Sequence, residues 1–84
     1  MTKEQIFTDV QKIICEYMGT VSVDEVTFDA NLHEDLGMDS IEIISVVAQM
    51  EEKFNVRIDD DKMIDFNMVG DYVEEIFNQC NDKK

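Results

Sequence analysis

Apolar residues recur at helical intervals along three segments of this 84-residue chain, and no other feature restricts the fold as much. The clearest stripe, at i, i+3, i+4, i+7, i+8 and i+11, consists of Val69, Tyr72, Val73, Ile76, Phe77 and Cys80. The N-terminal stripe consists of Ile6, Val10, Ile13, Ile14 and Tyr17, and the central one of Ile43, Val46, Val47, Met50 and Phe54. Such spacing is typical of helices that bury one face. Because strand-like alternation is lacking, the sequence predicts an all-α fold, a small four-helix bundle with one short helix.

End signals mark the first helix and the connection after it. Thr2 and Gln5 have the spacing of a capping box, which predicts a helix over residues 3–17. Residues 20–36 form a long connection for so small a domain, with a helical turn expected near residues 22–26. Long loops tend to carry function, and this one leads to the central helix. Its expected apolar anchors are Val23, Val26, Phe28, Leu32 and Leu36.

The later segments complete a single domain. Residues 55–58 are expected to be extended, residues 60–65 to form the short third helix, and residues 68–79 to form the last one. Residues 81–84 should fray. A chain of this length buries only a thin core, so we expect one domain over residues 1–84.

The central helix has the best-marked start. Gly37 supplies the freedom that a tight turn needs, Asp39 can act as the N-cap, and Glu42 can complete a capping box. Ser40 is then the first residue of a helix that continues to Phe54. An anion attached to Ser40 would meet unpartnered backbone N–H groups and the positive end of the helix dipole. On spacing alone, the simpler interpretation that Asp-Ser merely starts a helix is favoured.

A second apolar strip runs along the same helix, about a third of a turn from the core stripe. It consists of Ile41, Ile44 and Ala48, and Glu51 and Glu52 lie on its flanks. A small apolar strip rimmed by carboxylates is typical of a surface that binds a partner protein. Alternatively, a neighbouring segment of the bundle buries the strip. The sequence supports these two interpretations equally.

The charge balance narrows the class of partner. Lys and Arg total 7 against 20 Asp and Glu, which gives a net charge of −13. Nucleic acid and anionic membranes both need a basic protein face, so neither is an expected partner. Enzymes with basic surface patches are expected instead, and salt should weaken their association. Solubility alone is the competing explanation of the acidity, mainly in the loops and the tail.

The sequence contains no apolar run of membrane-spanning length and does not begin with a signal-peptide pattern. We therefore expect a cytoplasmic protein, or one inside an organelle if a transit peptide has been removed. No stable membrane association is expected.

Residues that commonly carry catalysis or bind metals are too few or wrongly spaced. His33 is the only histidine, so Ser40 has no histidine base close in sequence and no histidine cluster can bind zinc. Residues 59–61 are aspartates, but the positions after them do not match an EF-hand loop. Cys15 and Cys80 are expected to be free thiols in a reducing compartment. The sequence therefore predicts no catalytic residue and no metal site.

One segment carries a resemblance to a known family. Residues 32–42, Leu-His-Glu-Asp-Leu-Gly-Met-Asp-Ser-Ile-Glu, closely resemble the phosphopantetheine attachment segment of acyl carrier proteins. The usual form is Glu-Asp-Leu-Gly-x-Asp-Ser followed by Leu or a similar residue. The similarity continues through residues 50–54 and 56–58 to residues 69–73, and a looser pattern covers nearly the whole chain. The Asp-Ser pair alone is a weak signal, whereas the full motif with the apolar helix after it is specific.

The resemblance implies a carrier rather than an enzyme. A separate phosphopantetheinyl transferase would attach 4′-phosphopantetheine from coenzyme A to the Ser40 hydroxyl, beside Gly37 and Asp39, and the arm's thiol would hold acyl groups as thioesters. Acyl-processing enzymes with basic patches would dock on a surface made of Asp39, Ile41, Glu42, Ile44, Ala48, Glu51 and Glu52. Acyl chains would enter a cleft between the second and third helices, lined by Phe28, Val47, Ile58, Met63 and Ile64.

Fatty acid biosynthesis is the expected pathway, because the chain is free-standing, strongly acidic and has Asp before Ser40. A dedicated carrier for polyketide, aminoacyl or D-alanyl groups is the alternative with the same chemistry. An alternative of a different class is an unmodified helical adaptor that binds proteins through Ile41, Ile44 and Ala48. We expect a monomer, since the only exposed apolar strip is assigned to transient contacts.

Overall fold

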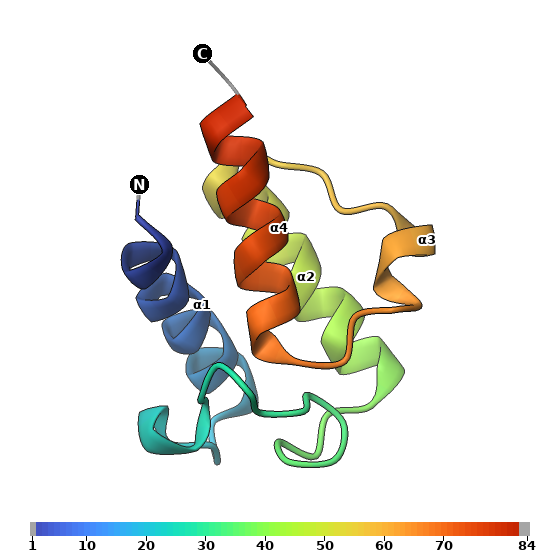
Figure 1. Ribbon diagram of the computed structural model, residues 1–84. Coiled ribbons are helices and arrows are strands. Elements are labelled where there is room, and N and C mark those ends of the chain that lie inside the picture. The colour runs from blue at the N-terminus through green and yellow to red at the C-terminus, as the bar shows by residue number, and fades with distance from the viewer. Residues whose placement is uncertain (1, 83–84) are drawn as a thin grey trace.

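Four α-helices and one short 3₁₀ turn make up the computed structural model, which describes residues 2–82. In chain order they are α1 (Lys3–Met18), the 3₁₀ turn η1 (Val23–Glu25), α2 (Ser40–Phe54), α3 (Asp60–Met63) and α4 (Val69–Asp82). α1 packs against both α2 and α4, and the connection from α1 to α2 runs across one end of these three helices (Figure 1). The described residues contain no β-sheet, only an isolated antiparallel bridge between Asn31 and Met68. The predicted all-α bundle is confirmed.

The ends of α1 follow the predicted signals. The Gln5 N–H donates to Thr2 Oγ1 at 3.1 Å, and the Thr2 N–H donates to Gln5 Oε1 at 2.9 Å, which completes the capping box. The helix ends one residue later than predicted, at Met18, and Gly19 follows it in the left-handed conformation with φ of 73°. The capping residues therefore set both ends of α1 locally.

The three predicted stripes meet in one core. Its most deeply buried members, each 1% exposed or less, include Ile6, Val10, Ile14, Val46, Met50, Val69, Tyr72, Val73 and Ile76. Tyr17, which was predicted to belong to the core, is 39% exposed in the last turn of α1. Ile43, at the start of the α2 stripe, is half-buried.

Backbone hydrogen bonds attach the connection between α1 and α2 to the start of α4. The Leu32 N–H donates to the Asn67 carbonyl at 3.0 Å, and the Val69 N–H donates to the Ala30 carbonyl at 3.0 Å. Val23 faces solvent and is 51% exposed, contrary to its predicted anchoring role, because it lies in the short turn η1, which buries no residue. The connection inserts three other predicted anchors into the core: Val26, Leu32 and Leu36.

A glycine allows the same connection to approach α4 closely. The Gly70 N–H donates to the Phe28 carbonyl at 2.8 Å, and a Cβ atom at position 70 would overlap the Phe28 ring. The ring also contacts Phe7 of α1, with 6.0 Å between centroids. The absence of a side chain at Gly70 is therefore what lets Phe28 lie between the connection and the two helices.

α3 and α4 depart from their predicted boundaries. α3 ends at Met63, before the predicted end at residue 65, and none of its residues is buried. α4 starts one residue later than predicted and extends to Asp82. Residues 81 and 82, expected in a frayed tail, therefore belong to a helix, and residues 83 and 84 lie outside the described part of the chain. Since α3 buries no residue, other contacts must hold it in place.

Candidate functional site

Ser40 is the first residue of α2, and it is exposed. The Glu42 N–H donates to Oδ1 of the N-cap Asp39 at 2.8 Å, and the Asp39 N–H donates to Glu42 Oε1 at 3.0 Å. The predicted capping box is therefore present. The N–H groups of Ser40 and Ile41 precede the first intrahelical donor, so the helix itself offers them no acceptor. An anion on Ser40 would lie close to these donors and to the positive end of the helix dipole.

Contacts within the preceding turn fix the position of Ser40. Gly37 has a left-handed φ of 69°, which a residue with a side chain rarely adopts. The Met38 side chain is fully buried, and the Met38 N–H donates to the Leu32 carbonyl at 3.0 Å. The Met38 carbonyl lies 2.9 Å from His33 Nδ1, and because a carbonyl can only accept, Nδ1 carries the proton. The turn is thus attached to the core immediately before Ser40.

Other polar side chains of this loop bind its own backbone. Asp35 Oδ2 accepts a hydrogen bond from the Asn31 N–H at 2.7 Å. Asn31 Oδ1 accepts from the N–H groups of His33 and Glu34 at 2.9 and 2.8 Å. These bonds stabilise the loop conformation that leads to Ser40.

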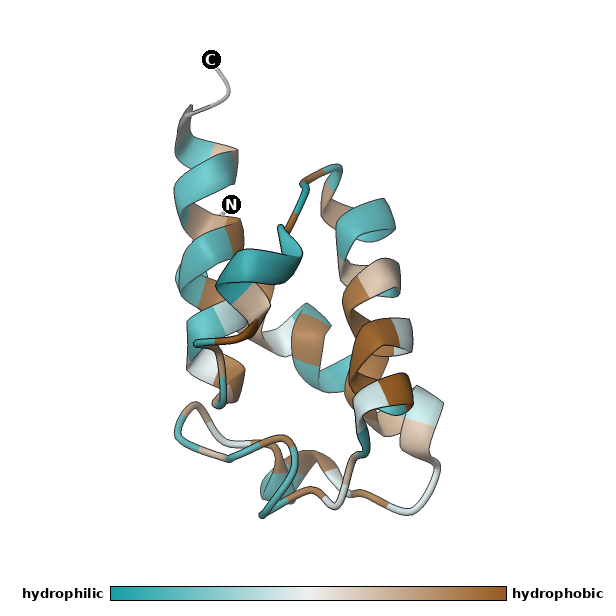
Figure 2. Cartoon of the chain, turned by 90° about the vertical axis from the view of Figure 1, so that its right-hand side faces the viewer, coloured by the Kyte–Doolittle hydropathy of each residue, from teal (hydrophilic) through white to brown (hydrophobic). Residues whose placement is uncertain are grey.

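The second apolar strip of α2 faces solvent. Ile41 is 73% exposed and Ile44 is 59% exposed, and Ala48 is also exposed. The alternative interpretation, in which a neighbouring segment buries the strip, is therefore wrong. In Figure 2 the ribbon of α2 is coloured mostly as hydrophobic, in contrast with the hydrophilic α3. Ile64, directly after α3, is 78% exposed and lines a depression together with Ile44, so it extends the apolar surface across to α3.

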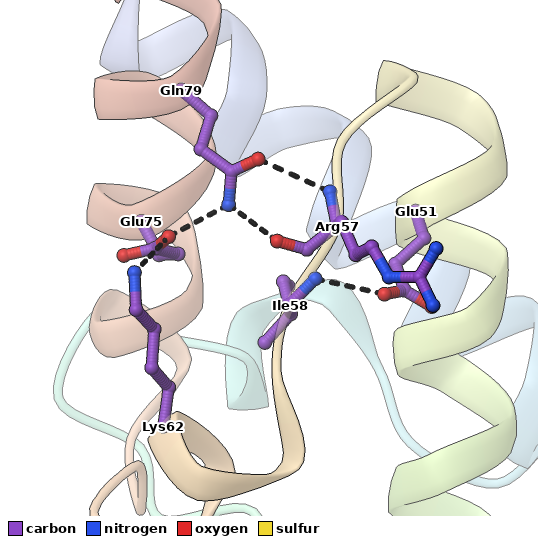
Figure 3. A network of polar contacts seen from close by, with 6 residues as sticks. All are labelled: Glu51, Arg57, Ile58, Lys62, Glu75 and Gln79. Atoms are coloured by element: carbon purple, nitrogen blue, oxygen red, sulfur yellow. Dashed lines mark hydrogen bonds and ion pairs between the residues drawn. The ribbon is translucent and has the colours of Figure 1, made fainter.

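The glutamates of the predicted docking surface differ in their burial and in the hydrogen bonds that they make within the chain. Glu42 is half-buried and closes the capping box at Asp39. Glu51 is half-buried too, and its Oε2 accepts a hydrogen bond from the Ile58 N–H at 2.8 Å (Figure 3). Glu52 is exposed and makes no hydrogen bond or ion pair within residues 2–82. Of the two glutamates that flank the strip, Glu52 is therefore the one that is free to meet a partner.

Polar side chains hold α3 and the segment before it to α4 (Figure 3). Lys62 Nζ donates to Glu75 Oε2 at 2.8 Å, and Gln79 Nε2 donates to the same oxygen at 2.7 Å. Gln79 also donates to the Arg57 carbonyl at 2.6 Å and accepts from the Arg57 N–H at 3.1 Å. The hydrogen bond from Lys62 lowers the pKa of Glu75, and burial partly opposes this effect. These contacts compensate for the missing apolar face of α3.

Two of the depressions in the surface adjoin α2 and α3. One, of about 860 Å³, is lined by several residues that include Val47, Ile58 and Met63. The other, of about 340 Å³, opens beside Ser40, and Met63 and Ile64 contribute to its lining. Four of the five residues predicted for the acyl cleft therefore lie at these two depressions.

Phe28 is the exception and lines neither depression. Its carbonyl accepts a hydrogen bond from the Gly70 N–H of α4, and its ring contacts Phe7 of α1. The two depressions therefore do not support the predicted contribution of Phe28 to the cleft, which stays a prediction.

The described residues form neither a metal site nor a membrane-spanning helix. Within residues 2–82, no three His, Cys, Asp or Glu side chains lie close enough together to hold a metal ion. Cys15 and Cys80 are free and half-buried, and burial raises the pKa of Cys15, with a smaller contribution from Glu25. The Cys15 thiol is therefore protonated at neutral pH and is a poor nucleophile. No helix in the described part of the chain is both long and apolar enough to cross a membrane.

Comparison with known families identifies the class of site. The family model described as "Phosphopantetheine attachment site" matches residues 8–76, which include the loop, α2, α3 and most of α4. The exposed serine at the start of α2 thus lies inside a domain of the class that carries phosphopantetheine.

Similar proteins of known sequence or structure belong to one family. The chain is 43% identical over 79 residues to an acyl carrier protein from Exiguobacterium sibiricum, an alignment that covers 94% of this chain and 99% of the relative. It is 39% identical to one from Thermotoga maritima, covering 89% and 91% of the two chains. A solved structure of an acyl carrier protein from Enterococcus faecalis matches with a TM-score of 0.77 and 32% identity, covering 93% of this chain and 98% of the other. The chain therefore belongs to the acyl carrier protein family.

The contact between Lys62 of α3 and Glu75 of α4 should stabilise the fold to an extent that depends on pH. The pKa of Glu75 in the folded protein is lowered from its ordinary value of 4.5. Its carboxylate therefore contributes stability that is fully present above pH 4.5. This contribution is lost as the pH falls below 4.5 and passes through the folded-state pKa. We expect Glu75→Gln to lower the Tm by a few degrees at pH 7, because the charged partner of Lys62 is lost. The difference from the wild type should close well below pH 4.5, where both side chains are neutral.

Thermal unfolding followed by circular dichroism measures this difference at each pH. Glu52→Gln is the matched control, since it removes the same charge from an exposed side chain without internal contacts. A Tm difference for Glu75→Gln that stays constant from pH 7 to pH 3 would contradict the proposed role of the carboxylate.

Proposed function

We propose that this chain carries acyl intermediates as thioesters on a 4′-phosphopantetheine arm that is attached to Ser40. The observation that carries this proposal is the position of Ser40, exposed at the N-terminus of α2 inside the matched attachment-site family. Two backbone N–H groups without intrahelical acceptors and the positive end of the α2 dipole suit a phosphodiester at this position. The apolar depression that opens beside Ser40 suits an acyl group close to the attachment point.

The attachment itself requires another enzyme. A phosphopantetheinyl transferase would join the Ser40 oxygen to the phosphopantetheine phosphate of coenzyme A, forming a phosphodiester. The pyrophosphate bond of coenzyme A would break, adenosine 3′,5′-bisphosphate would leave, and the transferase would take up the proton of the Ser40 hydroxyl. No side chain within residues 2–82 makes a hydrogen bond to the Ser40 hydroxyl, so none of them is placed to take its proton. We therefore assign no catalytic residue to the chain and regard it as a carrier that other enzymes act upon.

Fatty acid biosynthesis is the pathway that we propose for this carrier. The relatives over nearly the whole chain are named acyl carrier proteins, which favours this role over a dedicated polyketide, aminoacyl or D-alanyl carrier. An unmodified adaptor is disfavoured, because the matched family is defined by an attachment site for a prosthetic group.

The docking surface that we propose for partner enzymes is the exposed part of α2 and the end of α3. Its apolar part consists of Ile41, Ile44, Ala48 and Ile64, and Glu52 is its free acidic residue. The net charge of −13 suits partners with basic patches, which would be attracted before contact. Transient contacts on this surface agree with a monomeric carrier.

Mass spectrometry tests the attachment. We expect the wild-type chain, incubated with coenzyme A and a broad-specificity phosphopantetheinyl transferase, to gain the mass of one phosphopantetheine. Ser40→Ala should gain nothing, because the attachment oxygen is removed. Ser45→Ala is the matched control, since it removes a half-buried hydroxyl from the same helix, and it should gain the same mass as the wild type. No gain in the wild type, or an equal gain in Ser40→Ala, would contradict the proposal.

The rate of this loading reaction also tests the docking surface. We expect Glu52→Lys to slow loading about two- to tenfold at low salt and to weaken its salt dependence, because a free acidic contact becomes repulsive. Glu16→Lys, an equal charge change at an exposed position on α1, should have a smaller effect. Glu51→Lys is unsuitable because it would also break the hydrogen bond to Ile58. Equal rates for the two Lys variants would remove Glu52 from the docking surface and leave the attachment proposal intact.

A further inference from the structure

Tyr72 combines almost complete burial with an unused hydroxyl. It lies in the first turn of α4, and only 1% of it is exposed. Its ring meets the Phe66 ring edge-on, with 5.1 Å between centroids and 82° between planes. Yet its hydroxyl makes no hydrogen bond to any other residue in the range 2–82. Tyrosine hydroxyls in such places usually have a hydrogen-bond partner, so the hydroxyl of Tyr72 is available to water or to a group from outside the chain.

The hydroxyl of Tyr72 reaches accessible space. In the described part of the chain, every side-chain oxygen or nitrogen that is cut off from solvent has a hydrogen-bond partner. Since the Tyr72 hydroxyl has none, it must be in contact with accessible space. Tyr72 is one of the residues that line the depression of about 340 Å³ beside Ser40. Its accessible hydroxyl is therefore placed at the wall of that depression.

The Tyr72 hydroxyl is a hydrogen-bond donor with mostly apolar surroundings. Apart from Ser40 and Asp60, the other residues that line the depression are apolar: Ile43, Ile44, Met63, Ile64 and Phe66. Burial raises the pKa of Tyr72 to about 12, with a smaller contribution from the charge of Asp71. The hydroxyl is therefore protonated at neutral pH and can donate a hydrogen bond.

We propose that Tyr72 is a specificity-determining residue whose hydroxyl donates a hydrogen bond to an oxygen on the acyl group, as in a 3-hydroxyacyl or 3-oxoacyl thioester. The inference rests on the proposed function, because the acyl group reaches the depression on the arm of Ser40. A saturated acyl group of the same length would displace water from the hydroxyl without replacing the hydrogen bond. The depression should therefore favour oxygen-bearing acyl groups over saturated ones.

The experiment compares two acyl groups of equal carbon number. The chain is loaded from 3-hydroxybutanoyl-coenzyme A or butanoyl-coenzyme A by a broad-specificity phosphopantetheinyl transferase, and intact mass verifies the attached acyl-pantetheine. The rate at which hydroxylamine cleaves each thioester is measured and divided by the rate for the free acyl-coenzyme A, which removes intrinsic reactivity. The 3-hydroxybutanoyl group should be protected about two- to tenfold more than the butanoyl group, the range that one hydrogen bond supplies.

Two phenylalanine variants separate the hydroxyl from the ring. Tyr72→Phe keeps the ring that contacts Phe66 and should bring the protection ratio to about 1. The chain has two tyrosines, and Tyr17→Phe, which removes the exposed hydroxyl on α1, should leave the ratio unchanged. A purely structural role of Tyr72 would leave the ratio unchanged in Tyr72→Phe as well, and that result would overturn the inference. Equal protection of both acyl groups in the wild type would overturn it too.

NMR of the wild-type chain tests the same hydrogen bond without a variant, and it applies even if Tyr72→Phe does not fold. With ¹³C-labelled tyrosine, the Cζ resonance of Tyr72 should shift on loading with 3-hydroxybutanoyl but not with butanoyl, and identical spectra for the two forms would overturn the inference. Absence of any attached acyl-pantetheine in the mass spectra would instead overturn the proposed function, and this inference with it. The two failures are therefore distinguishable.

Discussion

The backbone hydrogen bonds between the connection before α2 and the start of α4 are the contacts on which the functional surface depends. They join Leu32 to Asn67 and Ala30 to Val69, two segments that are far apart in the sequence. Met38 then binds back to Leu32, so the residues immediately before Ser40 are attached to the core through α4. A long connection can therefore present a serine in a fixed position at the tip of α2, as an attachment site for a flexible arm requires.

The same structure divides the acidic residues into two groups. Asp35, Glu42 and Glu51 accept hydrogen bonds from the backbone and stabilise the loop, the start of α2 and the segment before α3. Glu52 makes no such contact and remains free for a partner. Only some of the acidic residues behind the net charge of −13 are thus available to contact other proteins. Substituting an internally bonded carboxylate would change folding and recognition together, which is why the choice of residue decides whether a docking experiment is interpretable.

The sequence predicted those features whose causes are local. The start of α2 follows from Asp39 and Glu42, which cap the helix within one turn, and the core stripes follow from helical periodicity. Features that depend on contacts between distant segments could not be predicted in this way. The direction of the Phe28 ring depends on the missing side chain of Gly70, and the role of Glu51 depends on an extended segment that turns back to α2. Likewise, the importance of Tyr72 appears only when α4 is placed beside Ser40.

Amide hydrogen exchange followed by NMR is the most direct measurement of whether the connection is attached to α4. We expect the Leu32, Met38 and Val69 amides to be protected nearly as strongly as amides in the middle of α4, because their hydrogen bonds open only when the bundle unfolds. The Ile41 amide, without an intrahelical acceptor, should exchange much faster. Exchange of the Leu32 and Val69 amides as fast as that of Ile41 would contradict the account, since the loop that presents Ser40 would then open independently of the fold.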